Sequence, residues 1–214
     1  MFDPAILDSF QYRLEKIRKI RPEDLVLQKD RDRLTVMDLK PDGFFELEGR
    51  HYSVSGICTY EETTEDYARK LDYTVTEMVC LEMETGKTVN VEFEFDDELE
   101  VTVSMDRISF SDLADEAGEA GEAVDSDDLD QIVKDQDVLV FGSEKFRYED
   151  DWAAVYNCRG KAEKVMMYEF ENDSGTKYIT VEEWEPDKNK PEYRIFLSRP
   201  VSISKIRIIT RGAQ

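Results

Sequence analysis

The sequence is poor in the residues and motifs from which most enzyme sites are built. It contains a single histidine, His51, and one imidazole cannot assemble the multi-histidine zinc sites of hydrolases. It has no nucleophile-elbow motif, no phosphate-binding glycine loop and no dinucleotide-binding fingerprint. Paired carboxylates carry little information, because a chain with 50 acidic residues contains such pairs by chance. We therefore expect a protein that is not an enzyme and that has no cofactor, no metal site and no catalytic residue.

Cysteine and long apolar runs are scarce as well. Cys58, Cys80 and Cys158 are an odd number at wide spacing, which favours reduced thiols that fill a core over a disulfide framework or a nucleophile. The longest apolar runs are too short to cross a bilayer. The chain starts Met-Phe-Asp-Pro, without the basic and then apolar stretch of a signal peptide. These features predict a cytoplasmic protein without stable membrane insertion.

The charge of the chain is strongly one-sided, with a formal net value of −22 at pH 7. Residues 1–21 carry +2, residues 22–110 carry −14, residues 111–137 carry −10, and residues 138–214 are balanced. Such an excess repels nucleic-acid phosphates and anionic lipid over a Debye length of about 8 Å. We therefore expect no nucleic-acid partner, and a cationic partner or ligand is favoured instead.

The two halves of the chain contain the same order of strand-like segments. The matched positions are Tyr52 with Phe146 and Leu99 with Tyr193, both 94 residues apart, and Gly86 with Gly175, which are 89 residues apart. Strict alternation of apolar and polar residues over 88–95 is typical of a strand with one buried face. We predict a mainly β fold of two tandem homologous units, each a small barrel or sandwich of about five strands. The expected domains are an N-terminal helix at 1–21, a first β unit at 22–110, an acidic flexible linker at 111–137 and a second β unit at 138–214.

The N-terminal segment has the pattern of an amphipathic helix. Asp3-Pro4 is a helix start, and apolar residues at helical spacing form one face as far as Ile20. We expect this helix to dock on the protein's own sheet. The alternative is a basic amphipathic helix that lies on a membrane or in a partner's groove.

The segment 111–137 is dense in acid and contains Gly118 and Gly121 but no aromatic residue, so it is predicted to be mobile. Within it, the run Asp125 to Asp130 places carboxylates at alternate positions, a pattern that suits calcium. The run lacks the loop glycine and the final glutamate of such a site, since position 136 is Gln136. A solvated acidic linker is the preferred interpretation.

An acidic ridge is the candidate binding surface of the first unit. Its members are Glu92, Glu94, Asp96, Asp97, Glu98 and Glu100, interrupted only by Phe93, Phe95 and Leu99, which are predicted to point inward. Like charges on neighbouring antiparallel strands repel one another, and a basic partner would relieve that repulsion. The alternative is that the charges only block pairing at a sheet edge.

Five segments together resemble a bacterial family catalogued as domain of unknown function 4178. They are Gly43 to Gly56, the charged aromatic loop Tyr60 to Tyr73, the Gly86 hairpin, Phe146-Arg-Tyr148, and Tyr178 to Trp184. The resemblance covers residues 36–209. The chain departs from the pattern at Pro41-Asp42-Gly43, where a Gly-Asp pair is expected, and in having little tryptophan in its first half. The resemblance implies a bacterial, β-rich, non-catalytic domain and carries over no catalytic residue.

The leading functional hypothesis is a non-catalytic cytosolic binding or scaffold module that presents the acidic ridge to a basic protein partner. A second hypothesis is a sensor or enzyme for a small cationic ligand, such as a polyamine, in a cleft between the two units where aromatic rings and carboxylates meet. A third is mimicry of a nucleic acid by surface carboxylates. The sequence leaves the oligomeric state open.

Overall fold

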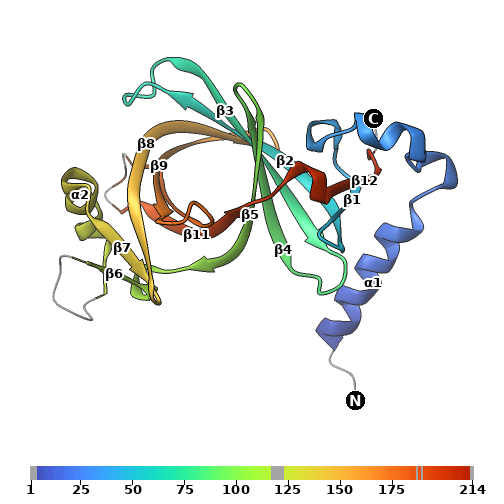
Figure 1. Cartoon of the computed structure of the whole chain (residues 1–214), viewed down its shortest axis with the longest axis horizontal. Helices are drawn as coiled ribbons and strands as arrows, with labels where there is room; N and C mark the ends of the chain where they lie inside the picture. The colour runs from blue at the N-terminus through green and yellow to red at the C-terminus, as the bar shows by residue number, and fades with distance from the viewer. Residues whose placement is uncertain (1–3, 117–122, 187, 189, 213–214) are drawn as a thin grey trace. The chain divides into compact units, whose positions relative to one another are not determined.

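The structure is a computed structural model that describes residues 4–116, 123–186, 188 and 190–212. It is mainly β, with two α-helices, α1 (Pro4–Arg18) and α2 (Ser126–Asp135), and several short 3-10 turns. The strands are β1 (Phe44–Leu47), β2 (Arg50–Thr63), β3 (Lys70–Glu82), β4 (Thr88–Phe95), β5 (Leu99–Ile108), β6 (Leu113–Asp115), β7 (Val138–Phe141), β8 (Glu144–Cys158), β9 (Lys161–Asn172), β10 (Tyr178–Trp184), β11 (Glu192–Pro200) and β12 (Ile206–Thr210). The predicted β-rich class and the N-terminal helix are confirmed (Figure 1).

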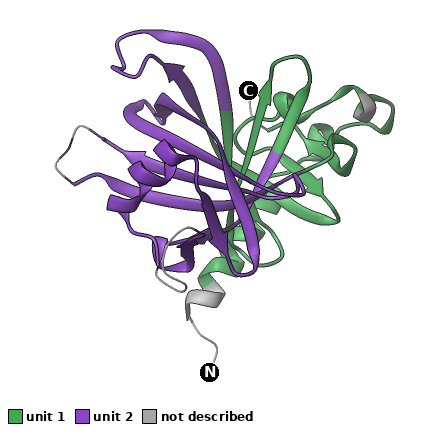
Figure 2. Ribbon diagram, turned by 60° about the vertical axis from the view of Figure 1, so that its left-hand side comes forward, with its two compact units in different colours: residues 1–58, 76–101, 201–214 green, residues 59–75, 102–200 purple. Residues whose placement is uncertain are grey.

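Hydrogen bonds join the strands in the order β12-β1-β2-β3-β4-β5-β11-β10-β9-β8-β7-β6, and β2 also pairs with β8. The chain divides into two compact units (Figure 2). Unit 1 contains residues 1–58, 76–101 and 201–214, and unit 2 contains residues 59–75 and 102–200. These bounds differ from the expected 22–110 and 138–214, because β12 at the end of the chain pairs with β1 and because β2, β3 and β5 contribute residues to both units.

Unit 1 is built around a short, tightly turned hairpin and a docked helix. The turn between β1 and β2 uses Glu48 and Gly49, both at positive φ, and β12 pairs antiparallel with β1 on its other edge. The Arg13 guanidinium of α1 donates hydrogen bonds to the carbonyls of Met83 and Glu84, at 2.7 and 2.8 Å, in the turn that follows β3. The helix thus contacts its own unit, as expected.

Glycine is required where α1 meets this turn. Gly86 has φ of +79°, and a Cβ at this position would lie 2.7 Å from the Ser9 hydroxyl oxygen of α1. A larger residue would therefore strain the turn and push against the helix. The apolar face of α1 is only partly covered, since Phe10 and Ile17 remain exposed.

Unit 2 buries both faces of the same strands. On β9, Tyr168 and Phe170 belong to one hydrophobic core, whereas Val165 and Met167 belong to a second core on the opposite face. Alternation on β10 follows the same rule, because successive side chains of a strand point to opposite faces. The first core also receives Leu129 and Ile132 of α2, and the second contains Trp152 and Trp184, the only two tryptophans of the chain.

A bulge in β8 decides on which face Trp152 lies. Phe146 near the start of β8 belongs to the core that α2 covers. The register with β9 shifts between Tyr148 and Asp150, so that one extra residue changes the phase of the strand. Without the bulge, Trp152 would face the same core as Phe146, because the two residues are an even number of positions apart. With the bulge, Trp152 lies opposite Met167 and faces the other core.

The described parts of the segment 111–137 form β6 and α2, which differs from the flexible linker expected for this range. Leu113 and Val124 are buried, and apolar side chains spaced along α2 enter the core of unit 2. The sequence prediction gave the acidic composition too much weight, because a few correctly spaced apolar residues are sufficient to dock a short helix. The predicted mobility of Gly118 and Gly121 concerns residues that lie outside the described ones.

The acidic run considered for calcium begins α2 instead. The Asp125 carboxylate accepts hydrogen bonds from the backbone amides of Asp127 and Asp128, at 2.7 and 3.2 Å. In return the Asp128 side chain accepts one from the Asp125 amide, at 2.8 Å, which completes a capping box. The carboxylates therefore satisfy the free amides at the start of the helix.

This cap generates a stability prediction. Replacing Asp125 with Ala removes the acceptor for two helix amides and should lower the free energy of unfolding by about 1 kcal/mol, measured by urea denaturation. Asp127→Ala is the matched control, because that side chain is not part of the cap, and it should cost about 0.5 kcal/mol or less. Equal losses in the two variants would contradict the capping role.

Candidate functional site

The inner face of unit 2 is organised around a buried carboxylate. Glu182 of β10 is only 3% exposed. Its oxygens accept hydrogen bonds from the Tyr60 hydroxyl of β2 and from the Trp184 indole Nε1, each at 2.7 Å. A buried charge is tolerated only when donors of this kind satisfy it, so these two bonds fix both aromatic rings relative to β10.

The two tryptophans differ in what covers their rings. The Arg194 guanidinium lies 4.0 Å from the centre of the Trp184 ring and also pairs with Glu192 at 2.8 Å, so an internal cation already occupies that aromatic face. Trp152 instead contacts the edge of Tyr73, with ring centres 5.2 Å apart, and its Nε1 donates to Glu169 at 3.0 Å. Among the described residues, no cation lies over the Trp152 ring.

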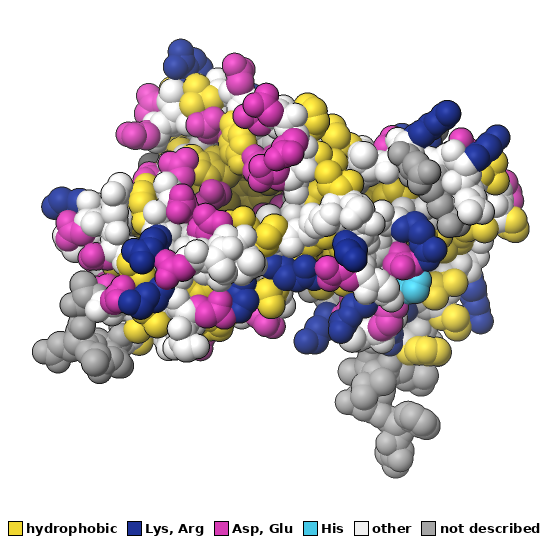
Figure 3. Space-filling model, viewed as in Figure 1, with side chains coloured by type: hydrophobic (Ala, Val, Ile, Leu, Met, Phe, Trp, Pro, Cys, Tyr) yellow, Lys and Arg dark blue, Asp and Glu magenta, His cyan; other side chains and the backbone are white. Residues whose placement is uncertain are grey.

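A pocket of about 720 Å³ lies beside Trp152 in unit 2 and is called the Trp152 pocket below. The loop between β2 and β3 forms one wall, and β8 with Met166 of β9 forms the other. Four carboxylates and one cation line it: Glu62, Glu65, Asp66, Asp151 and Arg69. Figure 3 shows acidic side chains around a hollowed part of the surface of unit 2, with hydrophobic atoms deeper in the hollow. The pocket therefore combines four carboxylates with one aromatic side chain, Trp152, which is 8% exposed.

The carboxylates of the pocket are held in different ways. Asp66 accepts hydrogen bonds from the Thr64 hydroxyl at 2.6 Å and from the Ala68 amide at 3.0 Å, and these bonds lower its pKa. Asp151 accepts a hydrogen bond from the Tyr148 hydroxyl, and burial together with this carboxylate raises the pKa of Tyr148. Glu62 and Glu65 form no ion pair with another described residue. These two carboxylates are the free negative charges of the pocket.

One further cation lies near the same loop. The Lys164 ammonium lies 4.7 Å from the centre of the Tyr67 ring, and its charge contributes to the lowered pKa of Asp66. Lys164 does not line the pocket. The lysine nevertheless shows that the aromatic and acidic character of this loop suits an ammonium group.

The acidic ridge predicted from sequence lies in unit 1. Asp96, Asp97, Glu98 and Glu100 are exposed at and after the turn between β4 and β5, whereas Glu92 and Glu94 are half-buried on β4. Glu92 stands directly opposite the buried Glu77 of β3. Phe95 was expected to point inward, and this is wrong: it is 63% exposed at the last residue of β4, where the chain turns toward β5.

Sequence reasoning missed the Trp152 pocket as a site. Its loop, Tyr60 to Tyr73, was noted only for its charged and aromatic composition, and Trp152 belongs to the second hydrophobic core, so its place in the lining has no local sequence signal. The pocket depends on β2 pairing with β8 through Thr63 and Ala153, a contact between residues 90 positions apart. A pattern among neighbouring residues of the sequence does not predict such a pairing.

His51 lies on the surface of unit 1 among carboxylates. Its Nδ1 is 2.8 Å from an oxygen of Glu84, and its Nε2 is 3.9 Å from an oxygen of Glu46. The hydrogen bonds from His51 lower the pKa of Glu84, although partial burial acts in the opposite direction. Among the described residues, no group of three or more His, Cys, Asp or Glu side chains could hold a metal ion.

The cysteines depart in part from the expectation of three reduced thiols. Cys80 is free and 1% exposed, and burial together with the nearby Glu77 raises the pKa of its thiol. Cys58 and Cys158 are disulfide-bonded, so the expectation is wrong for these two.

The chain is thus a mainly antiparallel β protein whose second unit carries a pocket lined by four carboxylates and Trp152. The model of the family "Domain of unknown function (DUF4178)" matches residues 40–202, so the chain belongs to this family, as its resemblance predicted. No curated protein matches it, and neither does any solved structure. None of the helices in the described residues combines the length and the apolar character that crossing a membrane requires.

The buried carboxylate generates a prediction about stability. Tyr60→Phe removes one of the donors to Glu182 and leaves part of its charge uncompensated, which should cost about 1 to 3 kcal/mol of unfolding free energy. Tyr12→Phe, at a half-exposed ring of α1, is the control and should cost about 0.5 kcal/mol or less. Chemical denaturation followed by tryptophan fluorescence measures both. A Tyr60→Phe variant as stable as the parent would show that the hydrogen bond is dispensable.

Burial of Cys80 generates a second prediction. Its thiol should resist alkylation by iodoacetamide at pH 8 in the folded protein, because the reagent needs an accessible thiolate and burial raises the pKa of this group. In urea the same thiol should react within minutes. Mass spectrometry of the labelled peptides gives the rate directly, and fast labelling under native conditions would contradict the buried position.

Proposed function

We propose that this protein is a non-catalytic binding module that holds cationic side chains of a basic protein partner in the Trp152 pocket. The observation that carries the proposal is the composition of that pocket, whose lining combines four carboxylates and one cation with Trp152. Carboxylates attract an ammonium or guanidinium group, and an aromatic ring adds a cation–π contribution. Both elements come from the same unit.

The internal cations of unit 2 support the proposal. Arg194 stacks on Trp184 and Lys164 lies over Tyr67, so the fold already uses aromatic rings and nearby carboxylates to hold its own cations. Trp152 is the tryptophan without such a partner among the described residues. A lysine or arginine of a partner protein would complete the arrangement there.

The charge of the whole chain supports a basic partner rather than an acidic one. A net charge of −22 accelerates the approach of a cationic protein and makes the association rate depend on salt. The acidic ridge of unit 1 contributes to this field, and a role for Glu94 or Glu100 in direct contact stays a prediction. A volume of about 720 Å³ also admits a small polyamine, which is the competing ligand.

We also infer that the chain arose by internal duplication. The segments β1 to β5 and β7 to β11 follow one another as antiparallel hairpins in the same order. Phe45 pairs with Tyr52 in the first set, and Leu139 pairs with Phe146 in the second. Each residue of the second pair lies 94 positions after its counterpart in the first pair. After each set comes a Ser-x-Ser turn whose two hydroxyls are 2.8 Å apart, at Ser109 and Ser111 and again at Ser202 and Ser204. Such repeated detail supports one ancestral unit.

The bacterial origin and the cytoplasmic location stay predictions. The cytoplasmic location rested partly on reduced cysteines, and a protein with disulfide-bonded cysteines is more typical of an oxidising compartment. Mimicry of a nucleic acid is not proposed, because the free carboxylates of the pocket are grouped in one lining with Trp152 and do not form a regular array.

Titration with an octalysine peptide tests the binding proposal. The double variant Glu62→Gln with Glu65→Gln removes the free charges of the Trp152 pocket without breaking an ion pair, and it should weaken binding about tenfold, or about 1.4 kcal/mol. Glu94→Gln with Glu100→Gln is the control of equal charge in the acidic ridge and should have a much smaller effect. Isothermal titration calorimetry at two salt concentrations measures both.

Two outcomes would count against the proposal. One is a pocket variant that binds octalysine as well as the parent, and the other is a ridge variant that loses as much affinity as the pocket variant. Spermidine serves as the small-cation probe. Tighter binding of spermidine than of octalysine would assign the pocket to a small ligand instead of a protein.

A further inference from the structure

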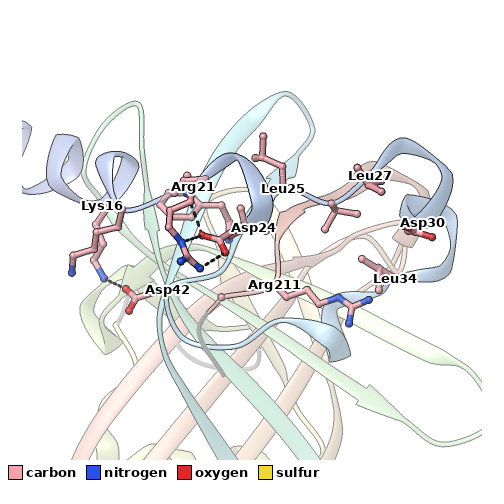
Figure 4. Close-up of a pocket in the computed structure, with 15 residues that line it drawn as sticks. Lys16, Arg21, Asp24, Leu25, Leu27, Asp30, Leu34, Asp42 and Arg211 are labelled. Carbon is pink, nitrogen blue, oxygen red and sulfur yellow. Dashed lines mark hydrogen bonds and ion pairs between the residues drawn. The ribbon is translucent and has the colours of Figure 1, made fainter.

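A second pocket, of about 460 Å³, lies in unit 1 and has a different chemical character. Its walls come from the end of α1, the segment 21–34, and the chain around Phe44 and Arg211 (Figure 4). The segment is tied to β12 by a bridge between Leu25 and Thr210 and by the hydrogen bond from the Val26 amide to the Ile209 carbonyl, at 2.9 Å. The pocket is therefore formed by backbone pairing rather than by side chains alone.

The apolar part of this pocket is open to solvent. Leu25 and Leu27 are 46% and 59% exposed, and Ile20 and Leu34 lie further along the lining. A contiguous exposed apolar patch with a polar rim is a common mark of a ligand or partner site. Figure 4 shows Leu25, Leu27 and Leu34 around the same side of the pocket.

The charged part of the lining has an excess of unpaired cations. Lys16 pairs with Asp42 at 2.5 Å and Arg21 pairs with Asp24 at 2.9 Å, and each pairing lowers the pKa of the carboxyl group. Two further cations, Lys19 and Arg211, form no ion pair and no side-chain hydrogen bond with another described residue, although the charge of Lys19 contributes to the lowered pKa of Asp42.

Asp30 is the lining carboxylate without an ion-pair partner among the described residues, and the lining as a whole has four cations and three carboxylates. This sign is opposite to that of the chain as a whole, which carries −22. In Figure 4 the Arg211 side chain extends along the pocket toward Leu34, so that its guanidinium lies beside the apolar lining.

We propose that this pocket binds an amphiphilic anion, namely a linear apolar chain that ends in a carboxylate or a phosphate. Arg211 binds the head group, because its guanidinium donates two parallel hydrogen bonds to either oxyanion, and Lys19 adds positive charge to the lining. Leu25, Leu27 and Ile20 contact the chain. A volume of about 460 Å³ is within the usual range for small-molecule sites. The site is independent of the cation-binding role proposed for unit 2, since both its location and its charge differ.

Calorimetry with decanoate and decyl phosphate, each below its micelle concentration, tests the proposal. The parent protein should bind at least one of them saturably, and decanol, which has the same chain without the charge, should bind at least tenfold more weakly. Arg211→Gln should weaken the anion at least fivefold. The stronger of the two anionic probes identifies the head group.

Matched variants separate the site from general surface effects. Arg18→Gln removes a cation at the end of α1 that does not line the pocket, and it should change the affinity less than twofold. Leu27→Ser changes an exposed side chain of the lining and should weaken both probes at least threefold while the melting temperature stays constant. Equal binding of decanol and decanoate, or equal losses in Arg18→Gln and Arg211→Gln, would overturn the proposal, as would the absence of saturable binding.

Discussion

Strands β8 to β10 send alternate side chains into two separate hydrophobic cores, and the other features of unit 2 depend on this burial of both faces. One face packs against α2, and the other holds both tryptophans. Polar groups on the second face must find partners there, because water does not reach them. Glu182 is consequently bound by Tyr60 and Trp184, and this hydrogen bonding turns a hydrophobic face into one with fixed carboxylates and oriented rings.

The same burial of both faces underlies the proposal that Trp152, rather than Trp184, contacts an external cation. The cross-strand pairing of Glu182 with Arg194 keeps a cation beside Trp184, and that cation covers the ring. Near Trp152 the bulge of β8 and the pairing of β2 with β8 place carboxylates instead, and Glu62 and Glu65 form no ion pair with another described residue. An external ammonium or guanidinium group would supply the missing charge.

The sequence predicted the elements better than their assembly. Alternation around Val91 and apolar spacing before Ile20 identified strands and the first helix, because both patterns are local. The acidic run after Gly121 concealed α2, since the composition outweighed the spacing of Leu129 and Ile132. The face of Trp152 was not predictable, because it depends on one extra residue in β8. The Trp152 pocket depends in addition on strand pairing between residues far apart in the chain.

The indole spectrum of the protein labelled with ¹⁵N-tryptophan tests the central claim most directly. The chain has two tryptophans, so the spectrum contains two indole signals, and Trp152→Phe assigns them. On addition of octalysine the account predicts that the Trp152 signal moves in a saturable and salt-dependent way, while the Trp184 signal stays in place because Arg194 already covers that ring. A shift of the Trp184 signal alone, or no shift of either signal at saturating peptide, would contradict the assignment of the binding site to the Trp152 pocket.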